Sequence, residues 1–90
     1  MKVLVDEMYD GLDDLLIEKG FEAQSVKKLI AKGEKLKSDF SVLNYTRDNG
    51  MVLVTEDKEN EKACLENNIP YICLNKEQVF NTILESLKKL

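Results

Sequence analysis

The stretch Met51-Val-Leu-Val-Thr-Glu-Asp-Lys-Glu59 decides the fold, because a run of apolar β-forming residues ends abruptly in acidic side chains. Nearly the same pattern opens the chain as Val3-Leu-Val-Asp-Glu7. A continuous Val/Leu run bounded by polar residues is typical of a strand buried on both faces, as in a parallel sheet covered by helices. Ligands bind such sheets outside the carboxyl ends of the strands. We therefore expect the acidic residues at the two strand ends to share one rim: Asp6, Glu7, Glu56, Asp57 and Glu59.

Composition narrows the class of protein. The chain has 90 residues, of which 43% are hydrophobic and 33% charged, as expected of one small globular domain spanning residues 1–90. No segment approaches the roughly 20 apolar residues of a membrane span. Asp6 and Glu7 also interrupt the first apolar run before it can form a secretory signal. We therefore expect a cytoplasmic protein that makes no membrane contact.

The sequence contains no histidine. This excludes Ser-His-Asp and Cys-His catalysis and every histidine-ligated zinc site. The spacing of Cys64 and Cys73 matches neither a CxxC pair nor a metal knuckle, so both are expected to be reduced core thiols. Any catalytic acid, base or metal ligand must therefore come chiefly from carboxylates.

Charge is unevenly distributed along the chain. The net charge is −4, yet residues 27–37 contain five lysines and one glutamate, which gives this segment +4 and the rest of the chain −8. A basic segment beside an acidic rim is suited to holding a phosphate backbone over a metal site, with Lys35 and Lys37 as candidate contacts. A solvated, lysine-rich connection explains the same composition.

The first half of the chain predicts two strands, a helix between them and a second helix after them. Leu12, Leu15 and Leu16 follow helical spacing in residues 9–19, with Asp10 as the N-cap and Gly20 as the stop. Residues 21–26 alternate as an edge strand does. Helical turns in residues 25–37 are expected to break at Gly33, and Ser38 is the expected N-cap of a helix that ends at Asn49-Gly50.

The second half predicts two more strands, each followed by a helix. Residues 59–67 read as a helix, and Pro70 opens a fourth strand over residues 71–74. Asn75 caps the last helix, with Gln78 completing a capping box. Its apolar stripe consists of Val79, Phe80, Ile83, Leu84 and Leu87.

Right-handed crossovers then give an α/β fold with a small open parallel sheet of four strands in the order 2-1-3-4 and helices on both faces. This order makes the first and third strands neighbours, about 4.8 Å apart. Carboxylates leaving their ends can therefore converge on one divalent cation.

Each acidic candidate also has an ordinary structural explanation. Asp6 and Asp57 follow strands, where acidic residues often enter the first turn of a helix and are favoured by its dipole. That account gives no reason for two such endings on adjacent strands, so these two are the leading candidates. Asp39 follows Ser38 at a helix start and is explained by capping alone. Thr55 is either an orienting hydroxyl or an ordinary β-branched strand residue.

Three segments together resemble the compact PIN-like proteins, relatives of the PIN-domain ribonucleases that include many toxins of toxin–antitoxin pairs. They are Val3-Leu-Val-Asp-Glu7, Ser38-Asp39 and Val52-Leu-Val-Thr-Glu-Asp-Lys-Glu59. The resemblance covers residues 1 to about 75. It implies an endoribonuclease that uses Mg²⁺ or Mn²⁺, acts on RNA and pairs with an antitoxin. By the same resemblance the catalytic metal ligands are Asp6, Asp39 and Asp57, Glu59 stands in for a frequent second aspartate, and Thr55 matches a small hydroxyl residue near the substrate.

Two other hypotheses remain open. A non-catalytic PIN-like module would keep the fold and bind a partner through its apolar fourth strand and last helix, for instance as a homodimer through Leu87 and Leu90. A receiver-type signalling domain would use a phosphorylated aspartate at the end of the third strand and a lysine at a later strand, for which Lys76 is the nearest match.

Overall fold

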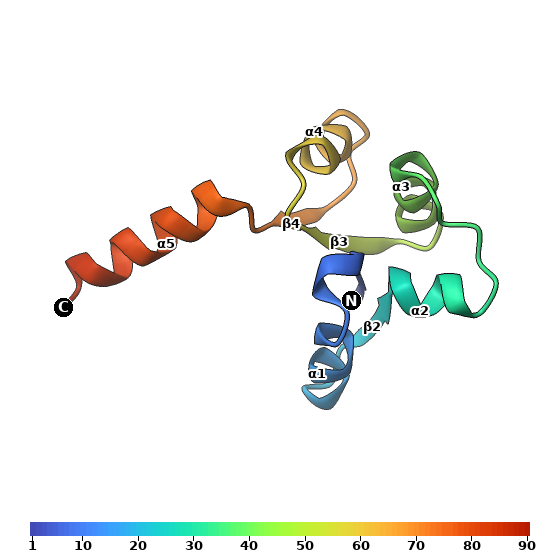
Figure 1. The fold of residues 1–90 in the computed structure, drawn as a ribbon, viewed down its shortest axis with the longest axis horizontal. Helices are drawn as coiled ribbons and strands as arrows, with labels where there is room; N and C mark the ends of the chain where they lie inside the picture. Colours follow the sequence, from blue (N-terminus) through green and yellow to red (C-terminus); the bar gives the residue numbers. More distant parts are fainter.

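The computed structural model describes residues 1–90 and has a four-stranded parallel sheet in the order β2-β1-β3-β4, as predicted (Figure 1). In register, Val5 pairs with both Ser25 and Val54, and Val54 pairs with Ile72. The strands are β1 (Lys2–Val5), β2 (Glu22–Ser25), β3 (Met51–Thr55) and β4 (Tyr71–Cys73). The helices are the 3₁₀ turn η1 (Glu7–Tyr9), α1 (Leu12–Glu18), α2 (Val26–Ala31), α3 (Asp39–Asp48), α4 (Lys58–Glu66) and α5 (Lys76–Lys88). None of the helices is long and apolar enough to cross a membrane.

Alternation along the strands divides the core between the two faces of the sheet. Leu4 and Leu53 point to one face, where they belong to a cluster of ten buried residues to which α2, α3 and α4 contribute. Val3, Val5 and Val54 point to the other face, where Tyr9 of η1 and Leu16 of α1 pack on them. The second face is therefore covered mainly over β1.

The structure corrects three predicted boundaries. Gly11, and not Asp10, is the N-cap of α1, because η1 occupies the start of the predicted helix and Asp10 ends it. Strand β4 ends at Cys73, one residue earlier than expected. Asn75 accepts a hydrogen bond from the Gln78 N–H, but the reciprocal bond of a capping box is not formed there.

A capping box occurs instead at α3. The Ser38 hydroxyl accepts from the Ser41 N–H, and the Ser41 hydroxyl oxygen accepts from the Ser38 N–H, each over 3.1 Å. This pair confirms the predicted start of α3 and orders the chain at the end of the lysine-rich segment. Gly50, with φ of 61°, follows the C-cap Asn49 and turns the chain into β3.

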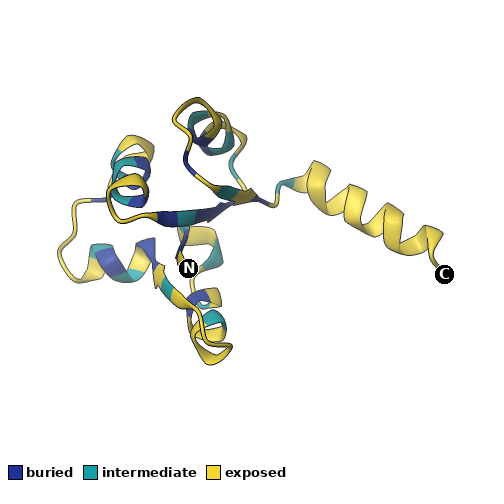
Figure 2. Cartoon of the chain, turned by 180° about the vertical axis from the view of Figure 1, so that it is seen from behind, coloured by how far each residue is buried: buried dark blue, intermediate teal, exposed yellow.

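Helix α5 projects away from the sheet, so that the molecule measures 47 Å along its longest axis and 20 Å along its shortest (Figure 1). None of its residues is buried, and it is exposed over its whole length (Figure 2). The predicted helix is confirmed, but its apolar stripe contacts no other element closely enough to be buried.

Candidate functional site

Asp6 stands at the junction of the two central strands. Its backbone N–H donates to the carbonyl of Val54 over 2.9 Å, which continues the pairing of β1 with β3 by one residue. Its carboxylate Oδ1 accepts from the Glu7 N–H over 2.9 Å and so caps η1. Oδ2 accepts from the Thr55 hydroxyl over 2.9 Å and from the Asn60 side-chain amide over 3.2 Å. The orientation of this carboxylate is therefore fixed from three sides.

Thr55 links Asp6 to the segment that follows β3. Its side chain is fully buried, and its hydroxyl oxygen also accepts from the Asp57 N–H over 3.1 Å. The Thr55 hydroxyl therefore donates to the Asp6 carboxylate and accepts from the Asp57 backbone, which fixes the position of Asp6 relative to the Asp57 backbone. This position favours the orienting interpretation of Thr55 over that of an ordinary strand residue.

Sequence reasoning missed Asn60. This residue lies in the first turn of α4, three positions after the N-cap Asp57, and is buried despite its polar side chain. Because side chains three apart lie on one helix face, the spacing from Asp57 was a usable signal for an inward-pointing amide. A buried amide needs a hydrogen-bond partner, and Asp6 supplies it.

Asp57 and Glu59 lie together at the start of α4. Strand β3 ends at Thr55, so Asp57 stands two residues beyond the strand and serves as the N-cap of the helix. Its Oδ1 accepts from the Glu59 N–H over 2.8 Å, and its Oδ2 accepts no hydrogen bond. Glu59 itself is exposed in the first turn. Asp57 therefore caps α4 through Oδ1, as the structural explanation of this residue predicted, and its Oδ2 remains free of hydrogen bonds.

Asp39 and the candidate lysines lie apart from these contacts. Asp39 is the exposed first residue of α3, and no hydrogen bond or ion pair joins it to Asp6 or Asp57. Lys35 and Lys37 are exposed in the segment before α3, which the buried Leu36 anchors in the core. The structure therefore does not connect Asp39 with the acidic residues of the sheet.

Lys28 forms ion pairs with two aspartates of α1. Its Nζ lies 2.7 Å from Oδ2 of Asp13 and 2.9 Å from Oδ2 of Asp14. The pKa of Lys28 is raised by its hydrogen bonds to these two carboxylates and by their charge. One of the five lysines of residues 27–37 is thus neutralised, and the basic segment is weaker than its composition suggests.

The rim carries further polar groups beside Asp6. The Ser25 hydroxyl, at the end of β2, donates to the Asp10 carboxylate, much as the Thr55 hydroxyl at the end of β3 donates to Asp6. A hollow of about 400 Å³ opens next to Asp57 and is lined by Met8, Glu56, Asp57, Asn75 and Lys76. Lys76, singled out only for the receiver hypothesis, thus lies near Asp57 at the rim.

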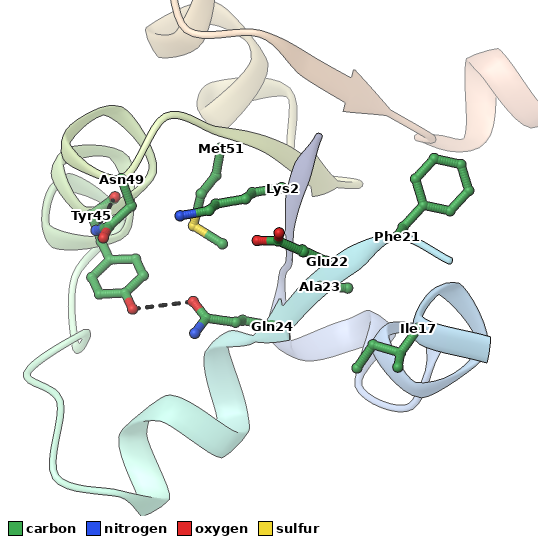
Figure 3. A pocket seen from close by; sticks show the side chains of 9 residues that line it. All are labelled: Lys2, Ile17, Phe21, Glu22, Ala23, Gln24, Tyr45, Asn49 and Met51. Carbon is green, nitrogen blue, oxygen red and sulfur yellow. Dashed lines mark hydrogen bonds between the residues drawn. The ribbon is translucent and has the colours of Figure 1, made fainter. Parts of the chain in front are cut away.

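Another pocket lies at the other end of the sheet. It measures about 420 Å³ and is lined by the first residues of three strands, Lys2, Glu22 and Met51, together with Tyr45 of α3 and Phe21 (Figure 3). The Tyr45 hydroxyl donates to the Gln24 amide oxygen over 3.1 Å across it. Asp6, Asp57 and Glu59 do not line this pocket, so it is separate from the acidic residues at the carboxyl ends of the strands.

The donor set at the rim suits a hard divalent cation. Mg²⁺ and Mn²⁺ prefer carboxylate, carbonyl and hydroxyl oxygens, which Asp6, Asp57 and Thr55 supply. No group of three or more acidic or thiol side chains is arranged to hold an ion in this structure. Both cysteines are buried and free, and burial raises the pKa of each thiol, which keeps sulfur out of the ligand set.

Comparison with known proteins gives the family. Ribonuclease VapC4 of Methanocaldococcus jannaschii is 34% identical to this chain, over 87% of this chain and 69% of the relative. The chain belongs to the VapC family of PIN-like proteins. No family model matches the sequence, and no solved structure matches it. The four-stranded parallel sheet in the order 2-1-3-4, flanked by helices, is consistent with a PIN-like fold.

Proposed function

We propose that the protein is a metal-dependent endoribonuclease whose site lies at the carboxyl ends of β1 and β3. The observation that carries the proposal is the Asp6 carboxylate, which Thr55 and Asn60 hold in place between adjacent strands. The relative's name, Ribonuclease VapC4, supports cleavage of RNA as the activity. A helix cap alone does not need two buried side chains from β3 and α4 to orient it.

In this proposal Asp6 and Asp57 are the principal metal ligands. Asp57 offers its free Oδ2, while Asp6 can coordinate through lone pairs that its three donors leave unused. Glu59 and Asp39, at the starts of α4 and α3, are further candidate ligands, and Asp39 lies apart from the contacts that join Asp6 and Asp57. A bound Mg²⁺ or Mn²⁺ would lower the pKa of a coordinated water and offset charge on the scissile phosphate. Thr55 and Asn60 act by keeping Asp6 aligned.

The substrate contacts follow from charge and position. Lys35 and Lys37 are exposed and free of ion pairs, and Lys76 lines the hollow beside Asp57. Each would contact RNA phosphates as a point charge, which adds affinity that salt screens. As a member of a family that contains a VapC toxin, the protein would also have an antitoxin partner and act in the cytoplasm.

The direct test is cleavage of single-stranded RNA in Mn²⁺ or Mg²⁺. Asp6→Asn and Asp57→Asn should each reduce cleavage by at least about 100-fold, because each amide removes a ligand charge with little change of shape. Asp48→Asn is the matched control, since Asp48 is an exposed aspartate at the far end of α3. Lys35→Ala should weaken cleavage mainly at raised salt. Activity that survives both site variants, or its absence from the purified wild type over varied RNAs, would refute the proposal.

Asp39→Asn separates the two roles of Asp39. Asparagine suits the first turn of a helix but is a poorer metal ligand. Loss of cleavage at unchanged stability would assign Asp39 to the site, and retained cleavage would leave it as part of the start of α3.

A non-catalytic binding module is the second candidate, favoured by the exposed apolar stripe of α5. In that case Asp6→Asn and Asp57→Asn would leave partner binding unchanged, and partner binding would depend on α5. Measuring cleavage and partner binding on the wild type, Asp6→Asn and Asp57→Asn distinguishes the two functions.

A further inference from the structure

An aromatic ring stands in solvent at the start of α3. Phe40 is 73% exposed, and among the large apolar residues only the terminal Met1 and Leu90 are more exposed. The capping box between Ser38 and Ser41 fixes the helical turn that carries this ring. Phe40 therefore presents a flat apolar surface, held by an ordered backbone, to a partner outside the chain.

Two polar side chains with unused hydrogen-bonding groups lie on the same face of α3. Asn44 and Arg47 follow Phe40 by four and seven residues, which is the spacing of one helix face. The Asn44 side chain is half-buried, and its amide makes no hydrogen bond within the chain. Arg47 is the only arginine in the sequence, and its Nε donates to the neighbouring Asp48 over 3.3 Å, which leaves both terminal nitrogens of the guanidinium group free.

The three side chains line a hollow of about 270 Å³ between α3 and α4, two helices that lie side by side (Figure 1). Its apolar wall includes Leu43 and Ile69, which belong to the larger core and are held in place by it. Pockets for drug-sized ligands have volumes of about 300 Å³ and more, so this hollow is suited to one small planar group. Glu66 of α4 also lines it, and a carboxylate repels phosphate but accepts from the amino groups of bases.

We propose that this hollow binds one unpaired nucleobase of RNA, which stacks on Phe40 and exchanges hydrogen bonds with the Asn44 amide, while Arg47 contacts a neighbouring phosphate. Every base has a face that can stack on an aromatic ring, and an amide offers one donor and one acceptor to a base edge. In a duplex these faces are stacked on neighbouring base pairs, so the hollow selects single strands. The inference rests on the proposed function only in taking RNA as the substrate.

The charges around the hollow favour RNA over an apolar segment of a protein. Lys35 and Lys37 precede Phe40 by five and three residues, and both are exposed and free of ion pairs. Arg47 adds a cation on the same helix, seven residues after the ring. Cations on either side of an aromatic side chain match the phosphates that flank a stacked base. An apolar peptide would cover the Asn44 amide without supplying it a hydrogen bond, which is unfavourable.

Binding of a fluorescently labelled oligoadenylate of about eight nucleotides tests the proposal, with EDTA present so that no divalent ion supports cleavage. Phe40→Leu keeps an apolar side chain and a good helix former but removes the ring, so it should raise the dissociation constant at least about tenfold. Phe40→Tyr keeps the ring and should bind as the wild type does. Phe80→Leu is the matched control, since Phe80 is an exposed phenylalanine on α5. Circular dichroism verifies that each variant keeps its fold.

Two further variants separate binding from stability. Asn44→Ala should weaken oligoadenylate binding without lowering the free energy of unfolding, because alanine favours a helix and the amide makes no hydrogen bond within the chain. Arg47→Gln should weaken binding and reduce the slope of log affinity against log salt by about one, as expected for the loss of one phosphate contact. A fully paired RNA hairpin should bind the wild type and Phe40→Leu equally.

Two results would overturn the proposal. One is an unchanged dissociation constant in Phe40→Leu. The other is a loss of affinity in Phe40→Tyr with none in Phe40→Leu, which would indicate a protein contact that needs apolar bulk and no ring. Binding in EDTA also separates this inference from the proposed function. Phe40-dependent binding by a protein that cleaves no RNA would refute the nuclease alone, whereas cleavage with binding that ignores Phe40 would refute the nucleobase site alone.

Discussion

The Thr55 hydroxyl donates to the carboxylate of Asp6 over 2.9 Å and so joins two residues that are 49 positions apart in the chain. The contact exists because β1 and β3 are parallel neighbours, with Val5 paired to Val54. It fixes the carboxylate on which the proposed chemistry depends. Asn60 reaches the same Oδ2 from α4.

Replacing Thr55 by valine should cost stability and activity together. The change keeps the shape but removes the hydrogen bonds to Asp6 and to the Asp57 N–H, at about 1–3 kcal/mol in the free energy of unfolding. Cleavage should fall at least about tenfold because Asp6 loses its alignment. Urea unfolding and an RNA cleavage assay measure the two effects.

Thr46→Val is the matched control for this variant. Thr46 is equally buried, but its hydroxyl donates to the Val42 carbonyl within α3. That carbonyl keeps its helical hydrogen bond, so stability should change little and cleavage should persist. Equal effects of the two substitutions would mean that Thr55 serves packing only.

Asn60→Asp should convert a hydrogen bond into a repulsion. The new carboxylate would face Asp6 at hydrogen-bonding distance. The repulsion between the two negative charges would raise the pKa of this carboxylate pair in the folded state. A raised carboxylate pKa destabilises the protein at pH 7, and the loss is recovered as the pH falls through that folded pKa. The melting temperature of Asn60→Asp should therefore lie below that of the wild type at pH 7. The gap should narrow as the pH falls from about 7 to about 4. Asn81→Asp, on the exposed α5, should follow the wild-type profile at all these values.

Millimolar Mg²⁺ or Mn²⁺ should raise the melting temperature of the wild type. An ion at ten times its dissociation constant stabilises the folded state by about 1.4 kcal/mol, which corresponds to roughly 5–10 °C for a domain of this size. Asp57→Asn keeps a good N-cap for α4 but loses a ligand, so it should melt normally without metal and shift less with it. The Asp48→Asn control should shift as the wild type does. Identical shifts in all three proteins would place the ion elsewhere.

The ion pair of Lys28 with Asp13 should give the protein an acid-sensitive stability. Burial raises the pKa of Asp13, but this is outweighed by its hydrogen bond to Lys28, by the Gly11 N–H and by the charge of Lys28, so that the pKa lies below its ordinary value of 3.8. A depressed carboxylate pKa contributes stability that is complete above pH 3.8 and is lost as the pH falls through the folded value.

Lys28→Met should therefore lower the free energy of unfolding at pH 7, because it leaves the buried Asp13 carboxylate without its cation. The difference from the wild type should narrow as the pH falls from about 5 to 2, where Asp13 becomes neutral. Lys27→Met removes an exposed lysine that makes no ion pair and serves as the control. A difference that stays constant with pH would assign the effect to lost packing.

The sequence by itself determined the sheet and the candidate acids. The continuous apolar runs near Asp6 and Asp57 are typical of strands buried on both faces, and the 2-1-3-4 order followed from short right-handed crossovers. Ser38, Gly50 and Asn75 marked helix ends through local backbone chemistry that needs no tertiary contact.

Only the tertiary structure decided which side chains meet at the rim and that the apolar stripe of α5 is exposed. The bond from Asn60 to Asp6 spans 54 positions and depends on where α4 lies over the sheet, which no local pattern specifies. By contrast, periodicity predicted the apolar stripe of α5, because such a stripe depends only on the spacing of apolar residues within one helix. It could not show that the stripe remains exposed, since burial depends on the direction in which the chain leaves β4 and on the surface it then meets.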